Sequence, residues 1–99
     1  MPNRNYISGR AFEYKRKKAW EERGYTVIRA SGSHGRWDLV AVKPNSPVVL
    51  IQCKKCMKAS EVNGLINEFK EQIDGWTKHY HEVIEIWVKE TRKLVEWYG

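Results

Sequence analysis

The chain has 99 residues, of which 41% are hydrophobic and 30% are charged. A chain of this length can bury one modest core but not two, so we expect a single domain over residues 1–99, with residues 1–7 as an N-terminal arm. No apolar run approaches the roughly 20 residues that span a bilayer, and the first residues lack the apolar segment of a signal peptide. We therefore expect an intracellular protein with no membrane partner.

The positive charge is concentrated at the start of the chain. Up to residue 36 there are nine Lys and Arg against three Glu, an excess of six, which equals the net charge of the whole chain. A basic surface confined to one part of a protein predicts a polyanionic partner. The alternative is a basic helix face that only contacts solvent.

The first predicted element is a helix from Ser8 to Arg23. Ser8 is a good N-cap residue, no Pro interrupts the segment, and Gly24 is a natural C-terminal stop. Within this helix, Glu13 falls at the boundary between core and solvent. The simplest interpretation is that the carboxylate of Glu13 forms an ion pair with Lys17, one turn further along the helix.

Three strands are predicted next, over 25–30, 37–42 and 48–54, because these segments are rich in β-branched and aromatic residues. A loop rich in Gly and Ser, residues 31–36, separates the first two strands, and a turn over 43–47 joins the second to the third. The third segment is almost continuously apolar, as expected of a central strand that is covered on both faces.

A second helix is predicted to begin at Ser60. Its apolar residues recur at helical spacing, which indicates a face buried in the core: Val62, Leu65, Ile66, Phe69, Ile73 and Trp76. Two further strands, over 82–89 and 94–98, complete the order αβββαββ. This order predicts an α/β protein with a central mixed β-sheet flanked by two helices.

Polar side chains gather where two predicted strands meet. Asp38 lies at the start of the second strand, and Gln52 and Lys54 lie at the end of the third. Gln52 and Lys54 share one face of their strand because residues two apart point to the same side. If these strands pair as a hairpin, an acid, an amide oxygen and an ammonium group converge at one edge of the sheet.

Cys53 and Cys56 form a C-x-x-C motif. A disulfide is not expected in an intracellular chain with one of these residues in a strand. A zinc site would need two more ligands, which only His79 and His81 could supply. We therefore interpret both cysteines as ordinary small side chains and keep zinc binding as the alternative.

In combination, these residues resemble the PD-(D/E)XK nuclease superfamily, and within it the archaeal-type Holliday junction resolvases. The resemblance runs from Gly9 to Lys54 and includes Glu13 on a basic helix, the Gly-Ser loop, DLVA at 38–41 and LIQCK at 50–54. It implies a restriction-endonuclease-like core. It also implies a Mg²⁺-dependent DNA endonuclease that cleaves branched DNA, with Mn²⁺ able to replace Mg²⁺.

The resemblance further implies a role for each site residue. Asp38 would be the main metal ligand, Glu13 and Gln52 would complete the metal site, and Lys54 would orient the attacking water or steady the charge that builds on the phosphate. Ser33 is the candidate for a phosphate contact. Gln52 departs from the family pattern, which has an acid at this position, so we expect weaker metal binding than usual.

The partner implied by the resemblance is branched or duplex DNA, bound by a homodimer, because cutting two opposed strands requires two active sites in a fixed relation. The alternatives are a related nuclease acting on flaps, nicks or duplex ends, and a catalytically silent DNA-binding protein with the nuclease fold. The short chain is consistent with a virus-encoded version. The residues expected to bind DNA phosphates are Arg4, Arg10, Lys15, Lys17, Lys18, Arg29, Arg36 and Lys55.

Overall fold

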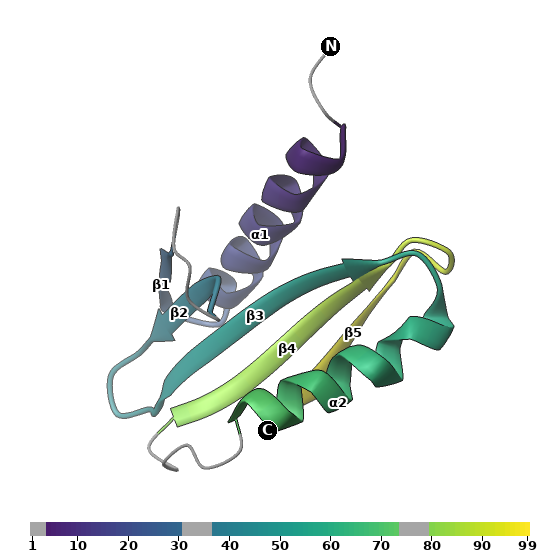
Figure 1. Cartoon of the computed structure of the whole chain (residues 1–99). Coiled ribbons are helices and arrows are strands. Elements are labelled where there is room, and N and C mark those ends of the chain that lie inside the picture. Colours follow the sequence, from purple (N-terminus) through teal and green to yellow (C-terminus); the bar gives the residue numbers. More distant parts are fainter. Residues whose placement is uncertain (1–3, 31–36, 74–79) are drawn as a thin grey trace.

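The computed structural model describes residues 4–30, 37–73 and 80–99, which form one sheet with a helix on each face (Figure 1). The order of elements confirms the predicted αβββαββ arrangement and the α/β class. The elements are α1 (Arg4–Glu22), β1 (Thr26–Arg29), β2 (Leu39–Val42), β3 (Val48–Cys56), the 3₁₀ turn η1 (Ala59–Glu61), α2 (Val62–Ile73), β4 (Tyr80–Val88) and β5 (Lys93–Tyr98).

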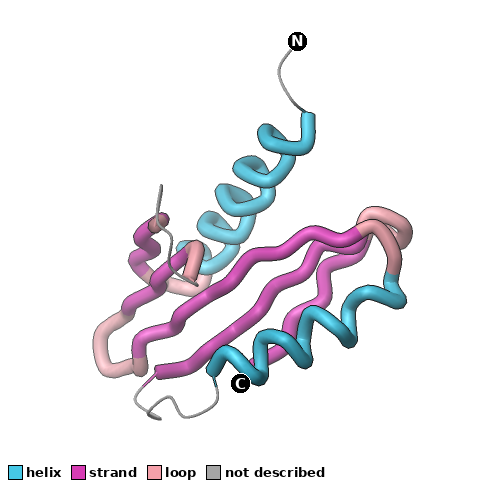
Figure 2. The backbone as a smooth tube through the Cα atoms, in the orientation of Figure 1, coloured by secondary structure: helices cyan, strands magenta, loops and turns pink. Residues whose placement is uncertain are grey.

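The sheet is mixed and its strands lie in the order in which they occur in the chain, from β1 to β5. β3 and β4 run parallel, whereas the other neighbouring strands run antiparallel. Parallel neighbours need a long crossover connection, and α2 provides it across one face of the sheet (Figure 2). β3 therefore lies inside the sheet, as its apolar sequence predicts.

Helix α1 begins at Arg4, so the prediction of an arm over residues 1–7 and a helix start at Ser8 was wrong. The residues just before Ser8 include no Pro or Gly and carry only a small penalty in a helix, so the helix continues through them. Its end is as predicted. Gly24 has a φ of 92°, and the amides of Gly24 and Tyr25 donate to the carbonyls of Glu21 and Trp20, which is a Schellman motif.

The two faces of the sheet carry separate cores because successive strand residues point to opposite sides. On the face of α1, Trp20 packs on residues from β1 to β4. The buried residues of this cluster are Trp20, Val27, Leu39, Ala41, Val49, Ile51 and Val83.

The other face is covered by α2, which uses the predicted apolar stripe. Phe69 is 1% exposed and meets the rings of Trp37 and Trp97 edge-on, with centroid distances of 5.7 and 5.9 Å. Full burial of such a side chain contributes about 1.5–3 kcal/mol to stability. Trp76, at the end of the predicted stripe, lies outside the described residues. Neither helix, over the residues described, is long and apolar enough to cross a membrane.

Candidate active site

Asp38 is held at the point where β2 begins beside β3. Its backbone N–H donates to the carbonyl of Ile51, and its own carbonyl accepts from the amide of Ala30, both at 2.9 Å. Its carboxylate Oδ2 accepts a hydrogen bond from the backbone N–H of Cys53 at 2.8 Å. Within the described part of the chain, Oδ1 makes no hydrogen bond or ion pair. β3 therefore orients the side chain through Oδ2.

The expected hairpin places Asp38 beside the middle of β3. The ladder ends at the pair Leu39–Ile51, and Asp38 then hydrogen-bonds to the backbone of Ile51 and Cys53, the two neighbours of Gln52. Gln52 is buried, at 7% exposure, whereas Lys54, two residues along the same strand, is exposed. The acid, the amide and the ammonium group thus lie where the pairing of β2 with β3 ends, in the middle of β3. The predicted hairpin is present, but β3 continues to Cys56 rather than ending at Lys54.

Glu13 does not pair with Lys17, so that simplest interpretation was wrong. Its Oε1 accepts from Nε of Arg29 on β1 at 3.1 Å, in an ion pair whose side chains are 25% and 19% exposed. Lys17 instead contacts Glu21 at 3.2 Å. Glu13 faces the sheet rather than solvent at this point of the helix, which makes a cation on β1 its nearest partner.

The Cys53 thiol is influenced by the charges of nearby acids. Burial raises the pKa of this thiol, and the negative charges of Glu85, Asp38 and Glu13 raise it further. Because three acids influence one thiol, Glu13 and Asp38 approach the same part of β3 from α1 and β2. Glu13 thus lies near the site although it pairs with Arg29.

The two cysteines do not form a joint site. Cys53 packs with the core under α1, Cys56 is buried in the core under α2, and both are free thiols. Residues three apart in a strand point to opposite faces, so Cys53 and Cys56 cannot chelate one zinc ion from β3. Of the two histidines considered as further ligands, His81 is exposed on β4 and His79 lies outside the described residues.

The side-chain oxygens of Asp38 and Gln52 suit a hard cation, since carboxylate and amide oxygens are ligands of Mg²⁺. Among the residues described, no group of three or more His, Cys, Asp or Glu is placed to hold one metal ion. Asp38 supplies the acid at the start of β2, and Gln52 lies on β3 between the two residues whose backbone Asp38 contacts. Mg²⁺ usually keeps several of its water ligands when it binds to a protein. A site that offers only one or two protein ligands can therefore still hold it.

The residues expected to bind DNA are in several different situations. Arg10, Lys15 and Lys18 are exposed on α1 and Lys55 is half-buried on β3, whereas Lys17 and Arg29 are engaged in the ion pairs described above. Arg4 lies in α1, but its side chain is not described. Ser33 and Arg36 lie outside the described residues.

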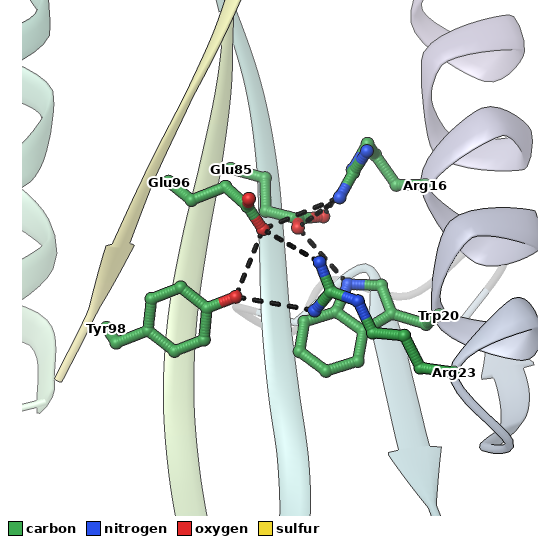
Figure 3. Close-up of polar contacts among 6 residues, drawn as sticks. All are labelled: Arg16, Trp20, Arg23, Glu85, Glu96 and Tyr98. Carbon is green, nitrogen blue, oxygen red and sulfur yellow. Dashed lines mark hydrogen bonds and ion pairs between the residues drawn. The ribbon is translucent and has the colours of Figure 1, made fainter.

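A cluster of charged residues between α1 and the strands β4 and β5 was missed by the sequence analysis (Figure 3). At its centre is Glu85, a residue with 0% exposure. Arg16 donates to both carboxylate oxygens of Glu85, at 2.9 and 2.8 Å, and the indole N–H of Trp20 donates to one of them at 3.1 Å. An acid inside the apolar run of β4 was the sequence signal that could have revealed it.

Glu96, the neighbour of Glu85 on β5, forms the outer part of this cluster. It accepts from the Tyr98 hydroxyl at 3.2 Å and is approached by Arg16 and Arg23 at 3.5 and 3.9 Å. Burial raises the pKa of Glu85, whereas the pKa of Glu96 is lowered by its interaction with Glu85 and by the positive charges of Arg16 and Arg23. The cluster therefore balances its charges internally and ties α1 to the sheet.

The mixed sheet, the α2 crossover and the acid beside the Gln-x-Lys segment of β3 define a protein with the nuclease-type α/β fold. The chain belongs to the archaeal Holliday junction resolvase (Hjc) family, because its sequence matches that family over residues 4–98. This confirms the resemblance recognised in the sequence.

Among solved structures, the chain is similar to Hjc of Archaeoglobus fulgidus, described as a Holliday junction resolvase from an archaeal hyperthermophile. The TM-score is 0.51 and the sequence identity is 20%, over 80% of this chain and 63% of that chain. At this identity the likeness concerns the fold, and the chain spans less than two thirds of the length of its structural neighbour. No curated protein sequence matches the chain.

Proposed function

We propose that the protein is a metal-dependent endonuclease that hydrolyses phosphodiester bonds in branched DNA, above all in four-way junctions. The observation that carries the proposal is the arrangement of Asp38, which the Cys53 N–H orients beside Gln52 and the exposed Lys54. Membership of the family indicates the junction as the substrate. The basic residues of α1 supply contacts to the phosphates of such a substrate.

The residues of the candidate active site have distinct tasks in this proposal. Asp38 and Gln52 would hold the cation, and Glu13 would support it from α1. The chemistry that Mg²⁺ or Mn²⁺ supplies when bound is neutralisation of phosphate charge and a lower pKa of water. The exposed ammonium group of Lys54 stabilises the negative charge that develops on the phosphate as the P–O bond breaks.

Gln52 lowers the charge of this site without removing an oxygen ligand. An amide brings no negative charge, and the Glu13 carboxylate is partly neutralised by Arg29. We therefore expect cleavage by this protein to need a higher concentration of metal ion than cleavage by an enzyme with an acid at this position. Junction cleavage also requires two active sites, so the proposal includes a homodimer.

The test is cleavage of a labelled four-way junction and of linear duplex with the same sequences, in Mg²⁺, Mn²⁺ or EDTA. We expect paired nicks in the junction alone, dependent on metal and lost in Asp38→Asn. This variant keeps the shape of the side chain but removes its charge. Equal cutting of both substrates would contradict junction selectivity and favour a nuclease for other DNA structures.

The second candidate function is DNA binding without cleavage. It is favoured by two observations, the amide at position 52 and the engagement of Glu13 with Arg29. Gln52→Glu separates the two candidates. An enzyme should cut at a lower metal concentration after this substitution, whereas a binding protein should cut nothing in either form.

A further inference from the structure

A cleft of about 260 Å³ lies between α1 and the sheet, on the opposite side of β3 from Gln52 and Lys54. The N-terminal part of α1 projects away from the sheet (Figure 2). Phe12, Trp87 and Leu94 form the apolar part of the cleft, and Lys15 and Lys55 also line it. None of these residues has a task in the reaction proposed above, apart from the expected phosphate contacts of the two lysines.

The positive charge of the cleft is not balanced by the residues that the structure describes. Arg16 also lines it, but its guanidinium is engaged with Glu85. Neither Lys15 nor Lys55 forms an ion pair with any residue that the structure describes. The pKa of Lys55 is lowered by burial and by the neighbouring charges of Lys89 and Lys15. An anion bound between these lysines would relieve their mutual repulsion.

The apolar part of the cleft presents an aromatic surface. The rings of Phe12 and Trp87 have centroids 6.5 Å apart and are tilted by 43°. Phe12 is buried, whereas Trp87 and Leu94 remain half-buried, so the indole is the ring that a ligand can reach. An aromatic face next to unpaired ammonium groups is the combination that binds single-stranded nucleic acid, because the base stacks and the phosphate pairs.

The cleft is close to the candidate active site along the chain. Lys55 directly follows Lys54, and Phe12 directly precedes Glu13. Adjacent strand residues point to opposite faces, so the cleft and Lys54 lie on the two sides of β3, in the part that follows the end of its pairing with β2 at Ile51. DNA that crosses this part of β3 can contact both.

We propose that the cleft holds one unpaired nucleotide of the DNA substrate, with its base against Trp87 and its phosphate between Lys15 and Lys55. The inference deepens the proposed function and rests on it for DNA as the partner. In this proposal, the cleft is the surface that recognises unpaired bases, which occur at distorted branch points of DNA. Duplex DNA without an unpaired base engages only the lysines.

The test is binding in EDTA, measured by fluorescence anisotropy with two labelled duplexes. One carries a single unpaired thymidine, and the other carries an abasic nucleotide at the same position. We expect the wild-type protein to bind the first about tenfold more tightly, as stacking of one base predicts. Equal affinity for the two duplexes would overturn the proposal without the need for any variant.

Trp87→Leu removes the aromatic face and keeps an apolar side chain, so it should abolish the difference between the two duplexes. Trp87→Phe should retain most of it. Thermal melting by circular dichroism verifies that both variants are folded at the temperature of the assay. A Trp87→Leu protein that is folded and still prefers the base would exclude stacking on this residue.

The two lysines are tested by the salt dependence of binding. Lys15→Gln and Lys55→Gln should each lower the salt slope by about one, as expected for the loss of one phosphate contact. Lys58→Gln, an exposed residue outside the cleft, is the matched control and should leave the slope unchanged. Unchanged slopes in both cleft variants would overturn the phosphate position.

Failure of this inference can be told apart from failure of the proposed function. Metal-dependent junction cleavage with no preference for the unpaired base would overturn the cleft alone. A clear base preference without cleavage in Mg²⁺ or Mn²⁺ would support the cleft and overturn the endonuclease.

Discussion

The buried charged cluster around Glu85 and the candidate active site around Asp38 are built from similar groups but differ in how their charges are satisfied. Glu85 has 0% exposure and receives three hydrogen bonds from Arg16 and Trp20. Asp38 receives a single side-chain hydrogen bond from within the described residues, and Lys54 beside it is exposed. Charges that are fully paired stabilise the fold, whereas charges left available can bind a ligand.

The difference follows from the cost of removing charge from water. A buried carboxylate is tolerated only when several donors replace its hydration. Arg16 and Trp20 come from α1 and Glu85 from β4, so these hydrogen bonds also fix the helix on the sheet. A site for a metal or a phosphate must keep part of its charge unsatisfied, and it cannot contribute equally to stability.

Glu85→Ala is the substitution with the largest expected effect. It leaves the Arg16 guanidinium without its main partner, and breaking a buried ion pair costs about 3–5 kcal/mol. Urea unfolding monitored by circular dichroism measures the loss. Glu21→Ala, which removes an exposed ion pair with Lys17, should cost less than about 1 kcal/mol. A loss of similar size in both variants would contradict the role assigned to the cluster.

Lys54→Ala tests the exposed charge of the candidate active site. Cleavage of the four-way junction should fall about 100-fold, or about 2.7 kcal/mol, because a group that stabilises the developing charge is lost. The free energy of unfolding should change by no more than about 0.5 kcal/mol, as for other surface substitutions. Lys58→Ala is the control for a general loss of charge. Cleavage at the wild-type rate would remove Lys54 from the reaction.

Trp20→Phe tests a single hydrogen bond inside the cluster. The indole N–H donates to the Glu85 carboxylate at 3.1 Å, and the loss of a bond to a charged group costs about 2 kcal/mol. Trp87→Phe is the matched control, because its indole N–H has no protein acceptor among the described residues. Equal destabilisation of the two variants would show that ring volume, rather than the hydrogen bond, determines the effect.

Arg23→Ala should have the smallest effect of the four. Its side chain is 44% exposed and lies 3.9 Å from Glu96, and its hydrogen bond to the Tyr98 hydroxyl is 3.4 Å long. Exposed ion pairs of this kind contribute less than about 1 kcal/mol. If chemical unfolding gave a loss as large as that of Glu85→Ala, the contribution of the cluster would not depend on burial.

The local pattern of the sequence determined the order of the elements, the crossover helix and the position of the candidate active site. Gly24 ends α1 as predicted, and the stripe around Phe69 faces the core, because these features depend on residues a few positions apart. Asp38, Gln52 and Lys54 were also predictable, since β2 and β3 are joined by a short turn and their register follows from it.

Only the tertiary structure decided which partners the charged residues of α1 have. Arg16 meets Glu85 across 69 positions of the chain, and Glu13 meets Arg29 rather than Lys17. The cleft beside Trp87 likewise depends on where α1 leaves the sheet. Side-chain pairing between distant segments is set by helix docking and strand register together, and short-range periodicity carries no information about either.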